Sequence, residues 1–205
     1  GMFNAVRLVV YYLIFSIAFF IIKKSKIVNK KRIAIISGVI FIILLNISAY
    51  LPPIENLFLT FKSPESAIKY MNNNVKTDTL MGKESALVLC HNKNGKEIGG
   101  NIIKKVKNGW KFASYTDVKT YIIKLKNSTT LIISKYKDDY YMEVDSFEEI
   151  NSISDSCGSI FKLTKKYQNK TIVVSEYYSY IKNYDDNYSI NINGEDIKIN
   201  INAQK

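Results

Sequence analysis

The sequence contains few of the residues that carry out most enzyme chemistry. Of its 205 residues one is a histidine and two are cysteines, and its only arginines are Arg7 and Arg32. One histidine and two dispersed cysteines match no zinc-binding spacing, and no acidic segment follows the calcium-loop pattern. The chain also lacks a glycine-rich phosphate loop and the known hydrolase nucleophile motifs. We therefore expect no metal and no cofactor.

The scarcity of arginine also limits the partners that this chain can recognise. Beyond Arg32 no guanidinium group is present to make bidentate contacts with phosphate. The net charge of +11 is uneven, since the first 54 residues hold seven basic and no acidic residues, whereas the rest holds 22 lysines and 18 acidic residues. A surface that binds nucleic acid usually carries a concentrated patch of basic residues. We therefore expect no nucleic-acid partner.

Low glycine and cysteine contents exclude several classes of protein. Nine glycines rule out a collagen-like chain, two cysteines rule out a disulfide-dense scaffold, and 47% apolar residues rule out disorder. At 205 residues the chain can form one ordinary domain and some additional structure. The apolar residues are concentrated near the N-terminus, where two long runs occupy residues 3–22 and 33–51.

These two runs predict a transmembrane helical hairpin over residues 1–52, because a membrane-spanning helix needs about 20 mostly apolar residues. The loop between them, residues 23–32, is strongly basic, and basic loops stay on the cytoplasmic side. Its basic residues are Lys23, Lys24, Lys26, Lys30, Lys31 and Arg32. We therefore expect a bacterial cytoplasmic-membrane protein with two spans, contact with membrane lipid, and both termini outside the cytoplasm.

Small and polar residues in the second run predict helix packing. Ala34 and Gly38 are four residues apart, which lets another helix approach closely, and Asn46 can form a hydrogen bond across the hairpin. The same residues allow an alternative, in which the hairpin is an accessory subunit of a larger membrane complex. A second alternative is cleavage of the second run after Ala49, as in a signal peptide.

The rest of the chain predicts a linker at 53–62 and an extracytoplasmic β-rich domain at 63–205. Ser63, Pro64 and Glu65 form a helix start, and Asn72–Asn74 ends that helix. Asn-Gly pairs at 94–95, 108–109 and 193–194 indicate hairpin turns. The fold class is therefore α+β with a mainly antiparallel sheet. Strands are expected at 85–92, 97–106, 110–114, 118–126, 129–136, 140–145, 159–164, 171–181, 187–192 and 196–201.

Cys90 and Cys157 have three interpretations, of which the first is that they remain two separate thiols. Outside the cytoplasm they can form a disulfide, or Cys157 can act as a nucleophile with His91 as its base, in an envelope thiol enzyme or hydrolase. A Cys90–His91 pair is excluded if 85–92 is a strand, because neighbouring side chains then point to opposite faces.

The tyrosines are the last feature of the sequence that indicates a binding role. Tyr140, Tyr141, Tyr177, Tyr178 and Tyr180 lie in expected strands, and exposed tyrosine rows bind partner proteins or cell-wall glycans. Tyrosine is also simply a good strand residue, so the same pattern allows a purely structural role. We favour a non-catalytic binding or sensing module of the cell envelope over an enzyme.

Overall fold

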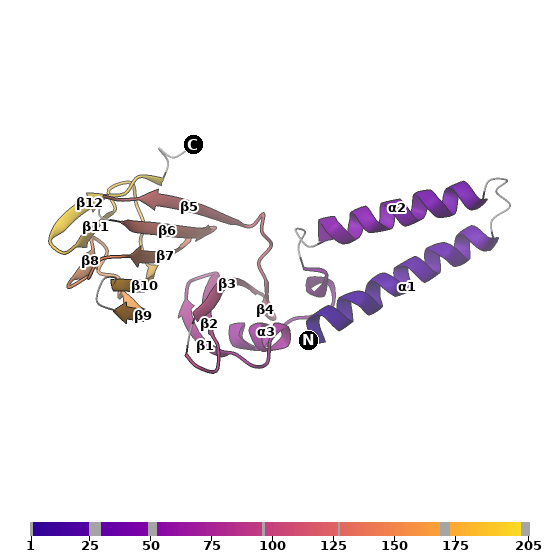
Figure 1. Cartoon of the computed structure of the whole chain (residues 1–205), viewed down its shortest axis with the longest axis horizontal. Helices are drawn as coiled ribbons and strands as arrows, with labels where there is room; N and C mark the ends of the chain where they lie inside the picture. Colours follow the sequence, from indigo (N-terminus) through magenta and orange to yellow (C-terminus); the bar gives the residue numbers. More distant parts are fainter. Residues whose placement is uncertain are drawn as a thin grey trace.

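The computed structural model describes residues 2–24, 30–48, 53–95, 97–126, 128–168 and 173–201. In these ranges the chain forms two long helices, a short 3-10 turn, a third helix and three antiparallel sheets (Figure 1). The helical elements are α1 (Met2–Lys24), α2 (Lys30–Ser48), η1 (Ile54–Leu57) and α3 (Pro64–Met71). The strands are β1 (Lys76–Met81), β2 (Ser85–His91), β3 (Glu97–Val106), β4 (Gly109–Phe112), β5 (Val118–Lys124), β6 (Thr129–Tyr136), β7 (Asp139–Ser146), β8 (Ile153–Asp155), β9 (Lys162–Gln168), β10 (Val173–Ile181), β11 (Ser189–Ile192) and β12 (Glu195–Lys198).

The expected transmembrane hairpin is wrong. Within the described ranges no helix combines the length and the apolar character that crossing a membrane requires. In α1, Arg7 limits the uncharged stretch to residues 8–22, about 22 Å at 1.5 Å per residue, which is shorter than a hydrocarbon core of about 30 Å. In α2, basic residues occupy the first turn, so the apolar stretch begins only at residue 33.

The expected location depended on those spans and is corrected with them. The assignment to a membrane, the cytoplasmic loop at 23–32 and the extracytoplasmic C-terminal part have no basis in the described helices. Lys26, in the expected loop, and Ala49, at the expected cleavage point, lie outside the described residues.

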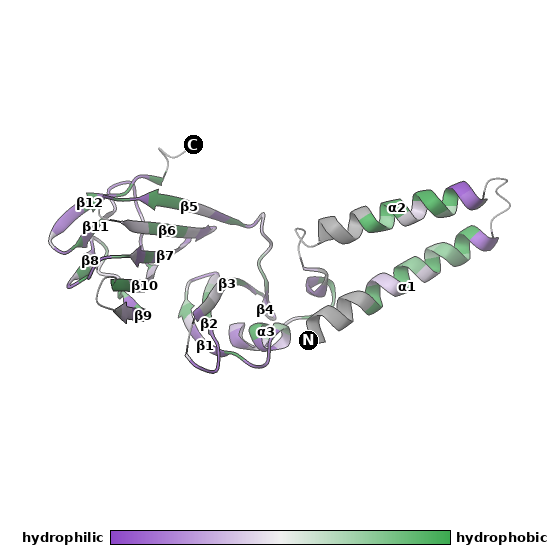
Figure 2. Cartoon of the chain, viewed as in Figure 1, coloured by the Kyte–Doolittle hydropathy of each residue, from purple (hydrophilic) through white to green (hydrophobic). Residues whose placement is uncertain are grey.

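The helices α1 and α2 lie side by side, and apolar residues cover much of both (Figures 1 and 2). The Phe41 ring packs 5.1 Å from the ring of Phe15 on α1. Ala34 lines a small cavity of about 290 Å³ between the helices. A Cβ atom at Gly38 would meet nothing within 4 Å, so this glycine marks no close approach, and the Asn46 side chain lies outside the described residues.

Sheet A contains β1 to β4 in chain order, and α3 packs on one of its faces. The helix begins as expected, because the Ser63 side chain accepts a hydrogen bond from the Ser66 N–H and Pro64 occupies the first turn. The core between helix and sheet consists of Ala67, Ile68, Ala86, Val88, Cys90, Ile103, Trp110 and Phe112.

The segment expected to be a linker packs along the edge of sheet A. The Asn56 side chain donates to the Phe112 carbonyl at 2.8 Å and accepts from the Phe112 N–H at 3.0 Å. Farther along, the backbones of Phe61 and Trp110 exchange two hydrogen bonds. These contacts extend the sheet beyond β4 and attach residues 53–62 to it.

Sheets B and C form the C-terminal part of the fold. Sheet B has the order β5-β6-β7-β10-β9, and sheet C has the order β12-β11-β8. One face of sheet B packs against sheet C over a core of aliphatic residues and one tyrosine. These residues are Leu131, Ile133, Met142, Val144, Ile150, Ile181, Tyr188, Ile190, Ile192, Ile199 and Ile201.

The other face of sheet B packs against sheet A. Leu87 and Leu89 of β2 contact Tyr141 of β7 and Tyr178 of β10 in a third buried cluster. At the edge of this contact, the Asp139 carboxylate accepts hydrogen bonds from the turn between β1 and β2. The contact between sheets A and B is therefore part apolar and part hydrogen-bonded.

Candidate binding groove

Three of the five tyrosines with a predicted binding role lie in the contact between sheets A and B. Tyr141 and Tyr178 are buried there, and Tyr180 packs against them. The Tyr178 hydroxyl donates to Glu97 at 2.6 Å, and the Tyr180 hydroxyl donates to Asp139 at 2.9 Å. Their hydroxyl groups are occupied within the protein.

The other two tyrosines lie on the opposite face of sheet B. Tyr140 stacks on Tyr184 with ring centroids 4.5 Å apart, and the Tyr177 hydroxyl donates to the Ile150 carbonyl at 3.3 Å. Successive residues of a strand point to opposite faces, so Tyr140 and Tyr141 of β7 lie on different faces of sheet B. The five tyrosines therefore present no common exposed row.

The two thiols are free and far from forming a catalytic pair with the histidine. Cys90 is buried beneath α3, whereas Cys157 packs against the core between sheets B and C. Burial raises the pKa of both thiols, which is the opposite of what activates a nucleophile. His91 lies on β2 of sheet A, where its Nε2 is 3.4 Å from Asp78 of the neighbouring strand β1. Cys157 and His91 thus lie in different parts of the fold, and the Cys90 side chain, although adjacent to His91 in the sequence, packs beneath α3.

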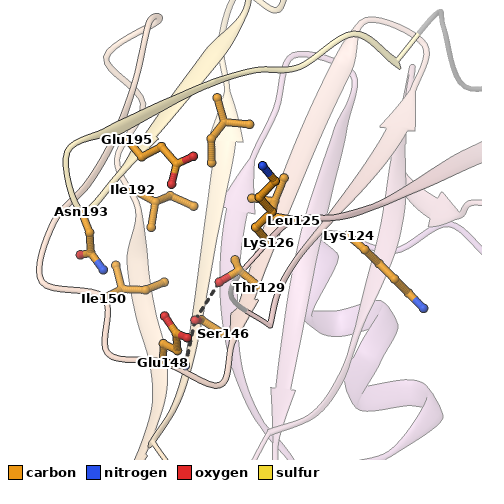
Figure 3. A pocket seen from close by; sticks show the side chains of 11 residues that line it. Lys124, Leu125, Lys126, Thr129, Ser146, Glu148, Ile150, Ile192, Asn193 and Glu195 are labelled. Atoms are coloured by element: carbon orange, nitrogen blue, oxygen red, sulfur yellow. Dashed lines mark hydrogen bonds between the residues drawn. The ribbon is translucent and has the colours of Figure 1, made fainter.

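A groove of about 480 Å³ opens between the end of sheet B and the β11–β12 hairpin (Figure 3). This volume is in the range typical of small-ligand sites. Three segments that are distant in the sequence line the groove. The lining residues are Lys124, Leu125, Lys126, Thr129, Ser146, Glu148, Ile150, Ile192, Asn193, Glu195 and Ile197.

The inner surface of the groove is part apolar and part hydroxyl-bearing. Ile150 and Ile192 are buried members of the core between sheets B and C, and each contributes an aliphatic side chain. The hydroxyls of Thr129 and Ser146 lie 2.9 Å apart in a mutual hydrogen bond. The Ser146 hydroxyl also accepts from the Glu148 N–H at 3.1 Å, which holds the start of the 147–151 loop.

Asn193 makes one wall of the groove rigid. Its side-chain oxygen accepts hydrogen bonds from the N–H groups of Asn151 at 2.7 Å and Ser152 at 3.2 Å. Its amide nitrogen donates to the Glu149 carbonyl at 2.9 Å. With φ of +53°, Asn193 adopts the left-handed conformation that a tight hairpin turn needs. The hairpin is thus tied to the opposite loop, and the groove is formed before any ligand arrives.

Charged side chains surround the opening of the groove. Glu148, Glu195 and Lys126 are exposed, and no ion pair is recorded for them within the part of the chain that the structure describes. Glu195 lies on the hairpin wall and Lys126 on the wall across from it, while the Lys124 side chain extends away from the groove (Figure 3). The side chains that face the opening therefore carry more negative than positive charge.

Sequence reasoning missed this groove almost entirely. Its segments are separated by up to about 70 positions, and only the Asn-Gly pair at 193–194 gave a local signal. Comparison with family models, with curated proteins and with solved structures finds no match. In the described residues no group of three or more histidine, cysteine or acidic side chains could hold a metal ion. The chemistry of the groove must be argued from its own geometry.

Proposed function

We propose that the β-rich part of the chain is a non-catalytic binding module that holds a short segment of a partner protein in the groove between sheets B and C. The segment places an aliphatic side chain against Ile150 and Ile192 and a basic side chain between Glu148 and Glu195. One observation carries this proposal. A preformed aliphatic surface lies beside the carboxylates of Glu148 and Glu195, which form no ion pair among the described residues.

The composition of the groove favours a peptide over the other ligand that the tyrosines suggested, a cell-wall glycan. Among the residues that the structure describes, no aromatic side chain lines the groove, so these residues offer no ring for a sugar to stack on. An aliphatic anchor beside charged rim residues is instead the usual arrangement of a protein–protein contact. Burial of one aliphatic side chain contributes about 1.5 to 3 kcal/mol, and the rim charges add orientation.

The proposal is tested with two end-capped hexapeptides, one carrying lysine–isoleucine–lysine and the other glutamate–isoleucine–glutamate. Titrated into the full chain and followed by NMR chemical shifts, the basic peptide is expected to bind and to perturb the amides of residues 148, 192 and 195. The acidic peptide is expected to bind at least about tenfold more weakly, because it meets two like charges.

Glu148→Gln combined with Glu195→Gln is expected to weaken binding of the basic peptide by about tenfold, the value of one charge-assisted hydrogen bond. Glu84→Gln is the matched control, since Glu84 is exposed and pairs with Lys137 away from the groove. Equal binding of both peptides, or no shift at the groove amides with either, contradicts the proposal.

A further inference from the structure

Carboxylates collect at one end of the contact between sheets A and B, on the face of sheet B opposite the groove. Glu143 and Asp145 project from β7, and their partners across the ladder to β10 are Tyr178 and Glu176. Glu97, at the start of β3, joins them from sheet A, where its carboxylate accepts the hydrogen bond of the Tyr178 hydroxyl. Four acidic residues from three strands thus meet between two packed sheets.

Few cations and hydrogen-bond donors lie near these carboxylates, so ionising all four together is energetically unfavourable. Lys165 of β9 pairs with Glu176 at 2.5 Å and also acts on the charge of Asp145. The Tyr178 hydroxyl lies within reach of both Glu97 and Glu143, but it has one proton to donate. Glu97 Oε2 and Asp145 Oδ1 are buried, and the structure gives neither a hydrogen-bond partner among the described residues. Unpaired buried charge of this kind is strongly unfavourable.

We propose that this end of the contact is a pH-sensitive clasp, in which protonated Glu143 keeps sheets A and B together and ionised Glu143 loosens them. The protonated carboxyl adds no charge beside Glu97 and Asp145. Ionisation adds a negative charge in a partly buried space that already holds negative groups, and opening the contact to water relieves the repulsion. The groove lies between sheets B and C, so the clasp is independent of the proposed function.

The electrostatics of Glu143 agree with this geometry. Burial, together with the neighbouring charges of Asp145, Glu97 and Glu176, raises the pKa of Glu143 to about 7, although the Tyr178 hydrogen bond lowers it. Burial and the charges of Glu176 and Glu97 also raise the pKa of Asp145, which Lys165 partly offsets. Glu143 therefore changes charge near neutral pH.

A second set of charged side chains, centred on Asp78, faces the same contact between sheets A and B. The test must separate its effect from that of Glu143. Asp78 of β1 lies 2.8 Å from Lys162 of β9 and 3.4 Å from His91 of β2. The hydrogen bond from Lys162 is the main reason why the pKa of Asp78 is lowered, and Asp78 keeps its charge over the neutral range. His91 is the other ionisable side chain of this group. A variant at His91 must therefore be compared with one at Glu143.

The direction of the pH effect follows from the raised pKa. In the closed state Glu143 keeps its proton up to a pH of about 7, whereas in the open or unfolded state it releases the proton near its ordinary value of 4.5. The stabilisation is therefore complete below pH 4.5 and is lost as the pH rises towards 7. The full difference corresponds to a change of about 300-fold in the equilibrium between closed and open forms.

Hydrogen exchange of the full chain at pH 5 and pH 8, corrected for intrinsic exchange rates, measures the opening. The amides of Leu87, Leu89 and Tyr178 are expected to lose at least about tenfold in protection at pH 8. Glu143→Gln is expected to abolish this loss, while Glu195→Gln, an exposed residue on the hairpin wall of the groove, leaves it unchanged. Protection that does not depend on pH, or a dependence that survives Glu143→Gln and disappears with His91→Gln, overturns the proposal.

Tyr178→Phe gives a second measurement if Glu143→Gln does not fold. Removing the hydroxyl removes the hydrogen bond that lowers the pKa of Glu143. The midpoint of the pH dependence is expected to move to higher pH. A midpoint that stays in place or moves down contradicts the role given to Glu143.

Discussion

Asp139→Ala is expected to lower the free energy of unfolding by about 4 kcal/mol, measured by urea denaturation near neutral pH. Asp139 is 1% exposed, yet its carboxylate has four donors. The N–H groups of Lys83 and Glu84 each donate at 2.8 Å, the Ser85 hydroxyl donates at 2.7 Å and the Tyr180 hydroxyl donates at 2.9 Å. Alanine would remove the acceptor of all four donors in the contact between sheets A and B, and the Ser85 hydroxyl would keep only its hydrogen bond with Tyr141.

The neighbouring residue provides the control. Asp138 occupies the same turn between β6 and β7 but is exposed, so Asp138→Ala is expected to change stability by less than about 0.5 kcal/mol. Similar losses for the two variants would show that the hydrogen bonds of Asp139 do not hold the sheets together.

The acid side of the stability curve gives a second readout for Asp139. Burial opposes its ionisation, but the hydrogen bonds from Lys83, Ser85, Glu84 and Tyr180 outweigh burial and lower the pKa of the carboxyl. A lowered pKa gives stability that is present above the ordinary value of 3.8 and is lost as the pH falls through the folded-state value. Asp139→Asn is expected to remove this part of the acid dependence.

Gly109→Ala is expected to be the other strongly destabilising change, with a loss of about 3 kcal/mol or more. Gly109 has φ of +136°, a conformation that side-chain-bearing residues rarely adopt. An added Cβ would also lie closer to the backbone oxygen of Phe61 than any real contact allows, and backbone cannot move aside as a flexible side chain can. The substitution would therefore separate residues 53–62 from sheet A.

Trp110, the only tryptophan, reports on this site because its backbone pairs with Phe61. The fluorescence emission of Trp110 is expected to shift to longer wavelength in Gly109→Ala, compared with the unchanged protein at the same temperature. Gly95→Ala is the matched control, since Gly95 also has a positive φ, +78°, but open space where its Cβ would lie. Its expected cost is about 1 to 2 kcal/mol from conformation alone. Equal losses for the two glycines would argue against the clash at Phe61.

Local signals in the sequence predicted local structure well. The helix start at Ser63 and Pro64 is confirmed, as is the hairpin at Asn94-Gly95 between β2 and β3. The hairpin at Asn193-Gly194 between β11 and β12 is confirmed as well. Such features depend on hydrogen bonds and backbone angles over two to four residues, which the residue types in that short stretch determine.

Elements without a distinct local pattern were missed or displaced. The strand β1, with the sequence KTDTLM, has little apolar content and is held by its pairing with β2. The strand β9 begins at Lys162, three residues later than expected, because its place is set by pairing with β10 across a bulge at Glu176 and Tyr177. For the long apolar runs, hydropathy alone did not show where the described helices begin and end.

What the sequence determined by itself was the antiparallel character of residues beyond 75, the caps and turns, and the absence of any metal-binding or nucleophile motif. Only the tertiary structure decided which side chains lie together and which of them are buried. It placed Cys157 against the core between sheets B and C and His91 beside Asp78 in sheet A, buried Tyr141 and Tyr178 between two sheets, and built a groove from three distant segments. The physical reason is that caps and turns arise from contacts within a few residues. A groove or a buried cluster of carboxylates instead depends on which faces of which strands meet, and that choice is made by packing over the whole chain.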